Sequence, residues 1–149
     1  MKKIETQIEI AAPPEKVWQV LTDFARYPDW NPFLKKISGK AQAGEKLSIF
    51  AQPDGASGIK FTPVVLKAES NRELRWIGKL FFGGLLDGEH YFEIKPINQN
   101  KTFFIHGEIF KGILVALLWR FLGENTERSY KLMNEALKNR TESLNLKEA

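Results

Sequence analysis

Two histidines and one glutamate have spacings that could bring them together in an apolar setting. His90 alternates with apolar residues along 87–95, and His106 and Glu108 do so along 102–111. If a turn joins the two segments, residues whose numbers sum to about 196–198 pair across it, so that His90 faces Glu108 or His106. An imidazole and a carboxylate in an apolar hollow perturb each other's pKa. They could bind a ligand or act as base and acid.

The same residues have blander readings. They could form a satisfied buried polar pair, or a parity error could place them in solvent. Two histidines and a carboxylate can ligate a metal, but no motif with metal-ligand spacing accompanies them, so we predict neither metal nor cofactor. The sequence contains no cysteine, phosphate-binding loop, nucleophile elbow or dinucleotide fingerprint. Any catalysis would therefore depend on His90, His106 and Glu108.

The first elements are predicted by alternation and proline placement. Residues 4–10 alternate apolar and polar, which indicates a half-buried strand. A helix follows from Pro13-Pro14 to about Asp23, because proline suits the first helical turn. Residues 24–33 hold four aromatics between two prolines, and they predict a short helical turn and a loop.

A run of strands and one long helix complete the chain. We predict strands at 34–40, 46–52, 59–70, 73–80, 87–95 and 102–111, with Pro63 marking an edge or a bulge. The helix spans Lys111 to Leu144. With residues 4–10 this makes a seven-stranded curved antiparallel sheet of the α+β class, wrapped around the helix with a cavity between.

The last helix has two unlike halves. Residues 113–119 are apolar on every face, whereas the part after Gly123 is amphipathic, with Tyr130 and Leu137 on its apolar stripe. We predict that the second half is the core helix, that 113–122 roof the cavity mouth, and that Gly123 is a hinge between them.

The loop at 80–86 is almost wholly apolar although it joins two strands. We predict a gate at the cavity mouth built by Phe81, Phe82, Gly83 and Gly84, with ordinary docking onto the last helix as the alternative. The predicted ligand-binding residues comprise aromatic and aliphatic wall positions and the three polar anchors: Trp18, Trp30, Phe50, Phe61, Trp76, His90, Phe92, Phe104, His106, Glu108, Phe110 and Leu117.

Length and charge bound the class of protein. The 149 residues predict one ligand-binding domain, 1–149. The net charge of +4 comes from scattered basic residues, so we expect no nucleic-acid partner. No secretion signal or bilayer-spanning segment is evident, which predicts a cytoplasmic protein. We expect a monomer or a weak dimer.

Several segments carry a family resemblance. Residues 8–18, the aromatic segment 24–32 with Tyr-Pro-Asp-Trp-Asn-Pro, Leu74-Arg75-Trp76 and residues 87–94 resemble the SRPBCC superfamily. That group contains the START, birch-pollen-allergen and polyketide-cyclase proteins. The resemblance covers nearly the whole chain and implies the helix-grip fold with a hydrophobic cavity. It also implies a lipid, sterol, polyketide or hormone as ligand and, in some members, a cyclase or hydrolase activity.

Three functions are open at this point. The leading one is binding or transport of a small hydrophobic ligand such as a lipid or polyketide, and it makes the protein more plausibly a carrier than an enzyme. The second is a cyclase- or hydratase-like enzyme that uses His90 or His106 with Glu108. The third is a membrane- or protein-docking module, with transient membrane contact through Phe81, Phe82 and residues 113–119.

Overall fold

The order of elements follows the predicted pattern of strand, short helices, strands and long helix. The computed structural model describes residues 1–80 and 82–148. β1 (Lys2–Ile10) leads into α1 (Pro14–Thr22), the 3-10 turn η1 (Phe24–Arg26) and α2 (Tyr27–Trp30). The strands are β2 (Leu34–Ser38), β3 (Ser48–Ala51), β4 (Ile59–Phe61), β5 (Val64–Glu69), β6 (Glu73–Leu80), β7 (Leu86–Asn98) and β8 (Lys101–Lys111). The long helix α3 (Val115–Glu148) follows.

The described strands form two antiparallel sheets, so the prediction of seven strands in one sheet is wrong. Five strands are ordered β1-β8-β7-β6-β5, and three shorter ones are ordered β2-β3-β4. The division falls where a single strand was predicted at 59–70. Pro63 has no N–H to donate to a ladder, and β4 ends before it while β5 begins after it. β4 then pairs with β3, and β5 pairs with β6.

The long strands carry the alternation that the sequence predicted. In β1 the side chains of Ile4, Thr6 and Ile10 are buried, and the residues between them face solvent. The predicted pairing across the last hairpin is confirmed, because His90 lies opposite Glu108 in the register of β7 and β8. The turn comes later than predicted, since β7 continues to Asn98.

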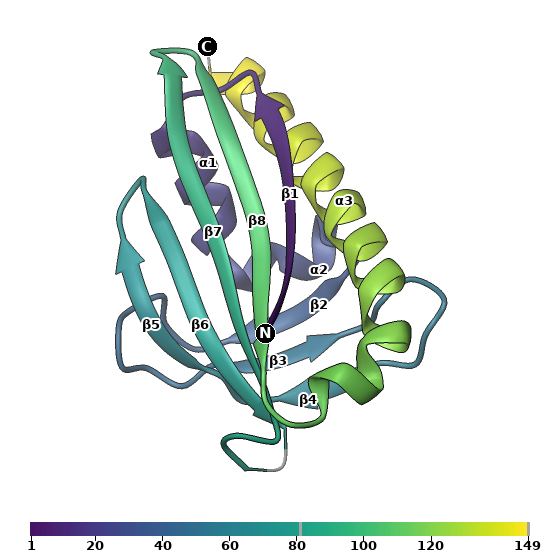
Figure 1. Ribbon diagram of the computed structural model, residues 1–149. Helices are drawn as coiled ribbons and strands as arrows, with labels where there is room; N and C mark the ends of the chain where they lie inside the picture. The colour runs from purple at the N-terminus through teal and green to yellow at the C-terminus, as the bar shows by residue number, and fades with distance from the viewer. Residues whose placement is uncertain (81, 149) are drawn as a thin grey trace.

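The long helix packs along the concave side of the large sheet beside β1, while β2, β3 and β4 cross below it (Figure 1). Tyr130, Met133 and Leu137 are fully buried against the sheet, which confirms the amphipathic second half of the predicted helix. α3 is continuous through Gly123. The α+β architecture of a curved sheet gripping the C-terminal helix is therefore as predicted.

The first turns of α3 are far less covered than an all-apolar sequence suggests. Val115 is buried, but Leu117 and Phe121 are 71% and 76% exposed, and Ile113 just before the helix is 77% exposed. One side of this segment packs on the sheet, where Trp119 meets Phe110 edge to face at 5.9 Å between ring centroids. The other side is an apolar surface open to solvent.

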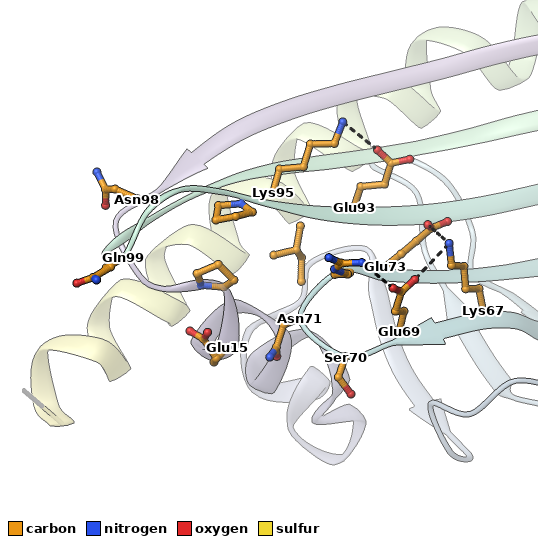
Figure 2. Close-up of a pocket in the computed structure, with 14 residues that line it drawn as sticks. Glu15, Lys67, Glu69, Ser70, Asn71, Glu73, Glu93, Lys95, Asn98 and Gln99 are labelled. Carbon is orange, nitrogen blue, oxygen red and sulfur yellow. Dashed lines mark hydrogen bonds and ion pairs between the residues drawn. The ribbon is translucent and has the colours of Figure 1, made fainter.

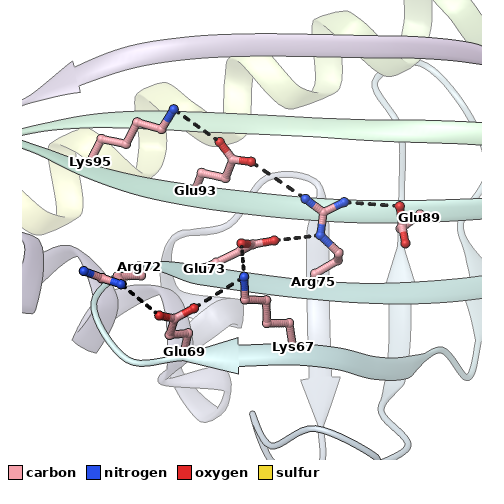
Figure 3. A network of polar contacts seen from close by, with 8 residues as sticks. All are labelled: Lys67, Glu69, Arg72, Glu73, Arg75, Glu89, Glu93 and Lys95. Atoms are coloured by element: carbon pink, nitrogen blue, oxygen red, sulfur yellow. Dashed lines mark hydrogen bonds and ion pairs between the residues drawn. The ribbon is translucent and has the colours of Figure 1, made fainter.

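The outer face of the large sheet is stabilised by cross-strand ion pairs. Arg75 on β6 contacts Glu73, Glu89 and Glu93, with nitrogen–oxygen distances of 2.7, 3.2 and 3.7 Å. Lys67 on β5 joins Glu73 at 2.8 Å, so that one chain of charges spans three strands (Figure 3). These side chains face away from α3, and they leave the concave face to apolar residues.

Candidate functional site

A cavity of about 230 Å³ lies between the two sheets and α3. The small sheet and the segment before it contribute apolar walls, β6 to β8 contribute the floor, and α3 closes one side. The residues around it are Phe33, Leu34, Ala51, Pro53, Ile59, Phe61, Trp76, Gly78, Lys79, Leu86, Gly88, His90, Glu108, Phe110, Leu122, Thr126 and Tyr130. Ile59 and Lys79 are exposed, and Leu122 and Thr126 are partly exposed, so the mouth lies among them.

A wider hollow of about 1110 Å³ lies at the other end of the sheet and is a poorer candidate. It is open and lies between the start of α1, the β5–β6 turn and the β7–β8 turn (Figure 2). Its charged side chains largely neutralise one another, as in the pairs of Lys67 with Glu69 and of Lys95 with Glu93 at 3.4 and 3.7 Å. A shallow surface of satisfied charges offers a small molecule little apolar contact.

The enclosed cavity has one polar end. Tyr130 of α3 donates its phenolic hydrogen bond to Oε2 of Glu108 on β8. Nδ1 of His90 on β7 lies 3.4 Å from Tyr130 Oη and 3.7 Å from Glu108 Oε2. Neighbouring strands place His90 and Glu108 directly opposite each other, and a buried residue of α3 completes the group.

A second polar layer lies behind the first. Nε2 of His90 is 2.8 Å from Nε2 of His106, whose Nδ1 is 2.9 Å from Oδ1 of Asn134. His106 also stacks on Tyr130 with 4.1 Å between ring centroids. His106 and Asn134 are fully or almost fully buried, and neither lines the cavity.

Burial shifts the pKa values of these groups toward their neutral forms. Loss of hydration raises the pKa of Glu108 to about 7, although the hydrogen bond from Tyr130 opposes the rise. Burial lowers the pKa of His106 to about 3. Burial, and then repulsion from His106, holds the pKa of His90 well below its usual range. Near neutral pH both imidazoles are therefore uncharged, and the Glu108 carboxyl is poised between its two forms.

The predicted site residues divide into three groups by position. Five line the cavity: Phe61, Trp76, His90, Glu108 and Phe110. Phe92, Phe104 and His106 are fully buried in the core beside it. The remaining four lie elsewhere: Trp18 and Trp30 are half-buried on α1 and α2, Phe50 packs over Gly58 on the small sheet, and Leu117 is exposed.

The predicted gate lies next to the start of the last helix. Phe81 is outside the described residues. Phe82 is 66% exposed, and the described part of the loop does not line the cavity. The loop is nevertheless attached to the segment that leads into α3, because Ile113 and Leu114 donate backbone hydrogen bonds to the carbonyls of Gly84 and Leu85 at 3.1 and 3.0 Å. Gating by this loop stays a prediction.

The sequence reading missed the contribution of α3 to the cavity. Leu122, Thr126 and Tyr130 recur at intervals of four and line one wall, and Asn134 continues the same row behind it. Tyr130 was predicted only as a core residue. A usable signal was present, since a polar Thr, Tyr and Asn repeat on an otherwise buried helix face indicates a polar partner on the facing sheet.

Two further observations limit what the described residues can do. No group of three or more His, Cys, Asp or Glu side chains within 1–80 and 82–148 converges closely enough to hold a metal ion. None of the helices in that part of the chain combines the length and the apolar character that crossing a bilayer requires.

Known structures with the same fold include several enzymes and binding proteins. The Zhui aromatase/cyclase from Streptomyces sp. R1128 superposes with a TM-score of 0.76 at 15% identity, covering 95% of this chain and 93% of that one. A START superfamily protein from Mycobacterium smegmatis has a TM-score of 0.71 at 22% identity, with 95% and 98% covered. A norcoclaurine synthase from Thalictrum flavum has a TM-score of 0.70 at 12% identity, with 96% and 95% covered.

At these identities the structural likeness shows the fold alone. No curated protein sequence matches the chain. The model of one family, described as polyketide cyclase / dehydrase and lipid transport, matches residues 1–142. With that match over nearly the whole chain, and with the curved sheet closed by α3 around a cavity, the chain belongs to the polyketide cyclase/dehydrase and lipid transport family of the START/SRPBCC superfamily.

Proposed function

We propose that the protein binds a small, largely apolar ligand in the cavity between α3 and the two sheets. The observation that carries this proposal is the lining, in which apolar walls converge on one polar end formed by His90, Glu108 and Tyr130. Such a combination is characteristic of small-molecule sites, where apolar contact supplies affinity and a few polar groups orient the ligand. Each Å² of apolar ligand surface that is buried contributes about 25 cal/mol before the cost of association.

The volume of the cavity limits the size of the ligand. About 230 Å³ is smaller than the roughly 300–1,000 Å³ usual for drug-sized ligands. We therefore expect one or two fused rings, or a short acyl chain, rather than a whole phospholipid or sterol. Native mass spectrometry of the purified protein would identify a ligand that co-purifies with it.

Blocking the mouth should abolish binding without unfolding the protein. Thr126 lines the cavity from α3 and is partly exposed, so Thr126→Trp would place an indole across the mouth. We expect naphthalene, used as an apolar probe in calorimetric titration, to bind at least tenfold more weakly to this variant. Glu127→Trp is the matched control, because Glu127 is the next residue of α3 and is exposed away from the cavity. Equal affinities in both variants would mean that the probe binds elsewhere.

An acid–base enzyme is the second candidate, and the polar end of the cavity favours it. Glu108 has a pKa of about 7 and contacts Tyr130, so it can take up or release a proton near neutral pH. Benzoylacetone, a neutral 1,3-diketone, tests this candidate. If Glu108 abstracts a proton from its methylene group, the protein should accelerate hydrogen–deuterium exchange there, as measured by NMR. Glu108→Gln should lose at least 100-fold of that acceleration while it still binds naphthalene. No acceleration by the native protein would leave binding as the function.

The surface beside the mouth supports transient contact with an anionic membrane. Phe82, Ile113, Leu117 and Phe121 expose apolar side chains there, and Lys79, Lys111 and Arg120 lie on the same segments and are exposed. A cationic border around apolar side chains suits the interface of an anionic bilayer.

Vesicle binding should depend on this end of α3 and not on the other. We expect Leu117→Asp with Phe121→Asp to reduce co-sedimentation with phosphatidylglycerol-containing vesicles at least fivefold. Leu146→Asp is the control, since Leu146 is 76% exposed at the opposite end of α3. An equal loss in the control, or no sedimentation of the native protein, would contradict membrane contact at the mouth.

A further inference from the structure

The buried polar layer behind the cavity has only one arrangement of hydrogens. Thr6 Oγ1 donates to the carbonyl of His106 at 2.9 Å, so its oxygen is free to accept from Asn134 Nδ2 at 2.8 Å. This contact orients the Asn134 amide and turns its Oδ1 toward Nδ1 of His106, 2.9 Å away. An amide oxygen only accepts, so His106 carries its hydrogen on Nδ1.

The assignment extends to the cavity through the two imidazoles. A neutral His106 that is protonated on Nδ1 has a bare Nε2, and this atom lies 2.8 Å from Nε2 of His90. The contact requires one hydrogen, so His90 supplies it from Nε2. The remaining nitrogen of His90, Nδ1, is then bare and is the one directed at Tyr130 and Glu108.

The groups around His90 leave that acceptor without a strong donor. Trp76 and Phe92 pack on the ring with centroid distances of 5.1 and 4.8 Å, and His106 occupies its other nitrogen. Tyr130 directs its hydrogen to Glu108, and the 3.7 Å between Glu108 Oε2 and His90 Nδ1 is beyond hydrogen-bond range. A buried acceptor without a partner favours a ligand that donates to it.

The polar end also disfavours an anionic ligand. Both imidazoles are neutral, and Glu108 would repel a carboxylate or a phosphate. Among the described residues that line the cavity, Lys79 is the one cation, and it is exposed at the mouth. A neutral hydroxyl matches the site better, because it can donate to His90 Nδ1 and accept from a protonated Glu108.

We propose that the cavity selects neutral ligands with a phenolic or enolic hydroxyl, which donates to Nδ1 of His90, and that Thr6 and Asn134 are positioning residues that create this acceptor. The proposal rests on ligand binding in the cavity and adds the chemical class of the ligand. Neither Thr6 nor Asn134 lines the cavity, and they act by determining which nitrogen of each imidazole holds the hydrogen.

Three probes that share one ring system test the ligand class by calorimetric titration. 2-Naphthol can donate a hydrogen bond, 2-methoxynaphthalene cannot, and 2-naphthoate is an anion. We expect 2-naphthol to bind about tenfold more tightly than the methyl ether, as one hydrogen bond to a buried acceptor predicts, and 2-naphthoate to bind most weakly. Equal affinities for 2-naphthol and its ether would overturn the proposed selectivity while leaving ligand binding intact. No binding of any probe would overturn both.

A conservative pair of variants tests the positioning role. Thr6→Ser keeps the hydroxyl and should keep the preference for 2-naphthol, whereas Thr6→Val keeps the shape and should reduce it at least threefold. Proton–nitrogen correlation spectra of the ligand-free proteins distinguish bare from protonated imidazole nitrogens. In the native protein and in Thr6→Ser, His90 should be bare at Nδ1, and in Thr6→Val both forms should be present. A His90 that is protonated at Nδ1 in the native protein, or an unchanged pattern and preference in Thr6→Val, would overturn this role.

Discussion

Replacing Glu108 by Gln should stabilise the protein at pH 8 and have little effect at pH 4.5. The folded protein raises the pKa of this carboxyl from 4.5 to about 7, so the folded state holds a proton that the unfolded state releases. The stability associated with the protonated form is fully present below about pH 4.5 and is lost as pH rises through about 7. One pKa unit corresponds to about 1.4 kcal/mol. We therefore expect Glu108→Gln to raise the free energy of unfolding at pH 8 by about 2 kcal/mol, because Gln can still accept from Tyr130 without charge.

The two histidines impose the opposite trend, which the variant should reveal. Their pKa values are lowered in the folded state, to about 3 for His106. Their contribution is therefore present above about pH 6.5 and is lost as pH falls toward 3. In the native protein this trend opposes that of Glu108 between about pH 4.5 and 6.5. In Glu108→Gln, stability measured by urea denaturation should rise steadily from pH 4 to pH 7. Glu124→Gln, at an exposed position of α3, is the control. An equal effect of Glu108→Gln at pH 4.5 and pH 8 would contradict a buried, proton-holding carboxyl.

Replacing Gly112 by Ala should be among the most disruptive small changes in the chain. Gly112 has a φ of +126°, which L-residues rarely adopt, and a Cβ there would lie 2.3 Å from the carbonyl oxygen of Leu85. The obstacle is backbone, so the β6–β7 loop or the start of α3 must move. We expect a loss of about 2–4 kcal/mol in the free energy of unfolding by urea denaturation. We also expect faster hydrogen exchange at the amides of Ile113 and Leu114, which donate to that loop.

Gly123→Ala is the matched control for this change. Gly123 lies inside α3, and a Cβ there would meet Trp119 at 3.6 Å, an ordinary contact. Alanine should therefore stabilise the helix by about 0.5–1 kcal/mol. The same variant tests the predicted hinge, since stiffening it should slow exchange of naphthalene measured by NMR line shapes. Unchanged exchange would count against a hinge. If Gly112→Ala were as stable as Gly123→Ala, the close approach of the loop to the segment before α3 would be wrong.

Local patterns in the sequence predicted most of the elements and one of the key contacts. The alternation of residues 4–10 became β1, and the pairing of His90 with Glu108 followed from strand parity and the position of one turn. Antiparallel hairpins are short-range structures, so their register can be read along the chain. The same reading merged β4 and β5, because periodicity does not show whether a strand on either side of Pro63 continues to the same neighbour.

The contacts that make the site depend on separations too long for local patterns. Tyr130 is 22 residues from Glu108, and Asn134 is 128 residues from Thr6. A helical repeat shows which residues share a face of α3, but the position and rotation of that helix on the sheet are set by packing of the whole core. For this reason Trp18 and Phe50, aromatic and plausible in sequence, lie away from the cavity, whereas Thr126 and Leu122 line it.

The sequence by itself determined the class of this protein: an α+β chain with a curved antiparallel sheet, a long amphipathic C-terminal helix, and a histidine and a glutamate paired on an apolar face. Only the tertiary structure decided which neighbours this pair has. It placed Tyr130 against Glu108 and set Asn134 and Thr6 behind His106. The physical reason is that a residue's face is encoded by its near neighbours, whereas its partner is selected by the free energy of packing the entire core.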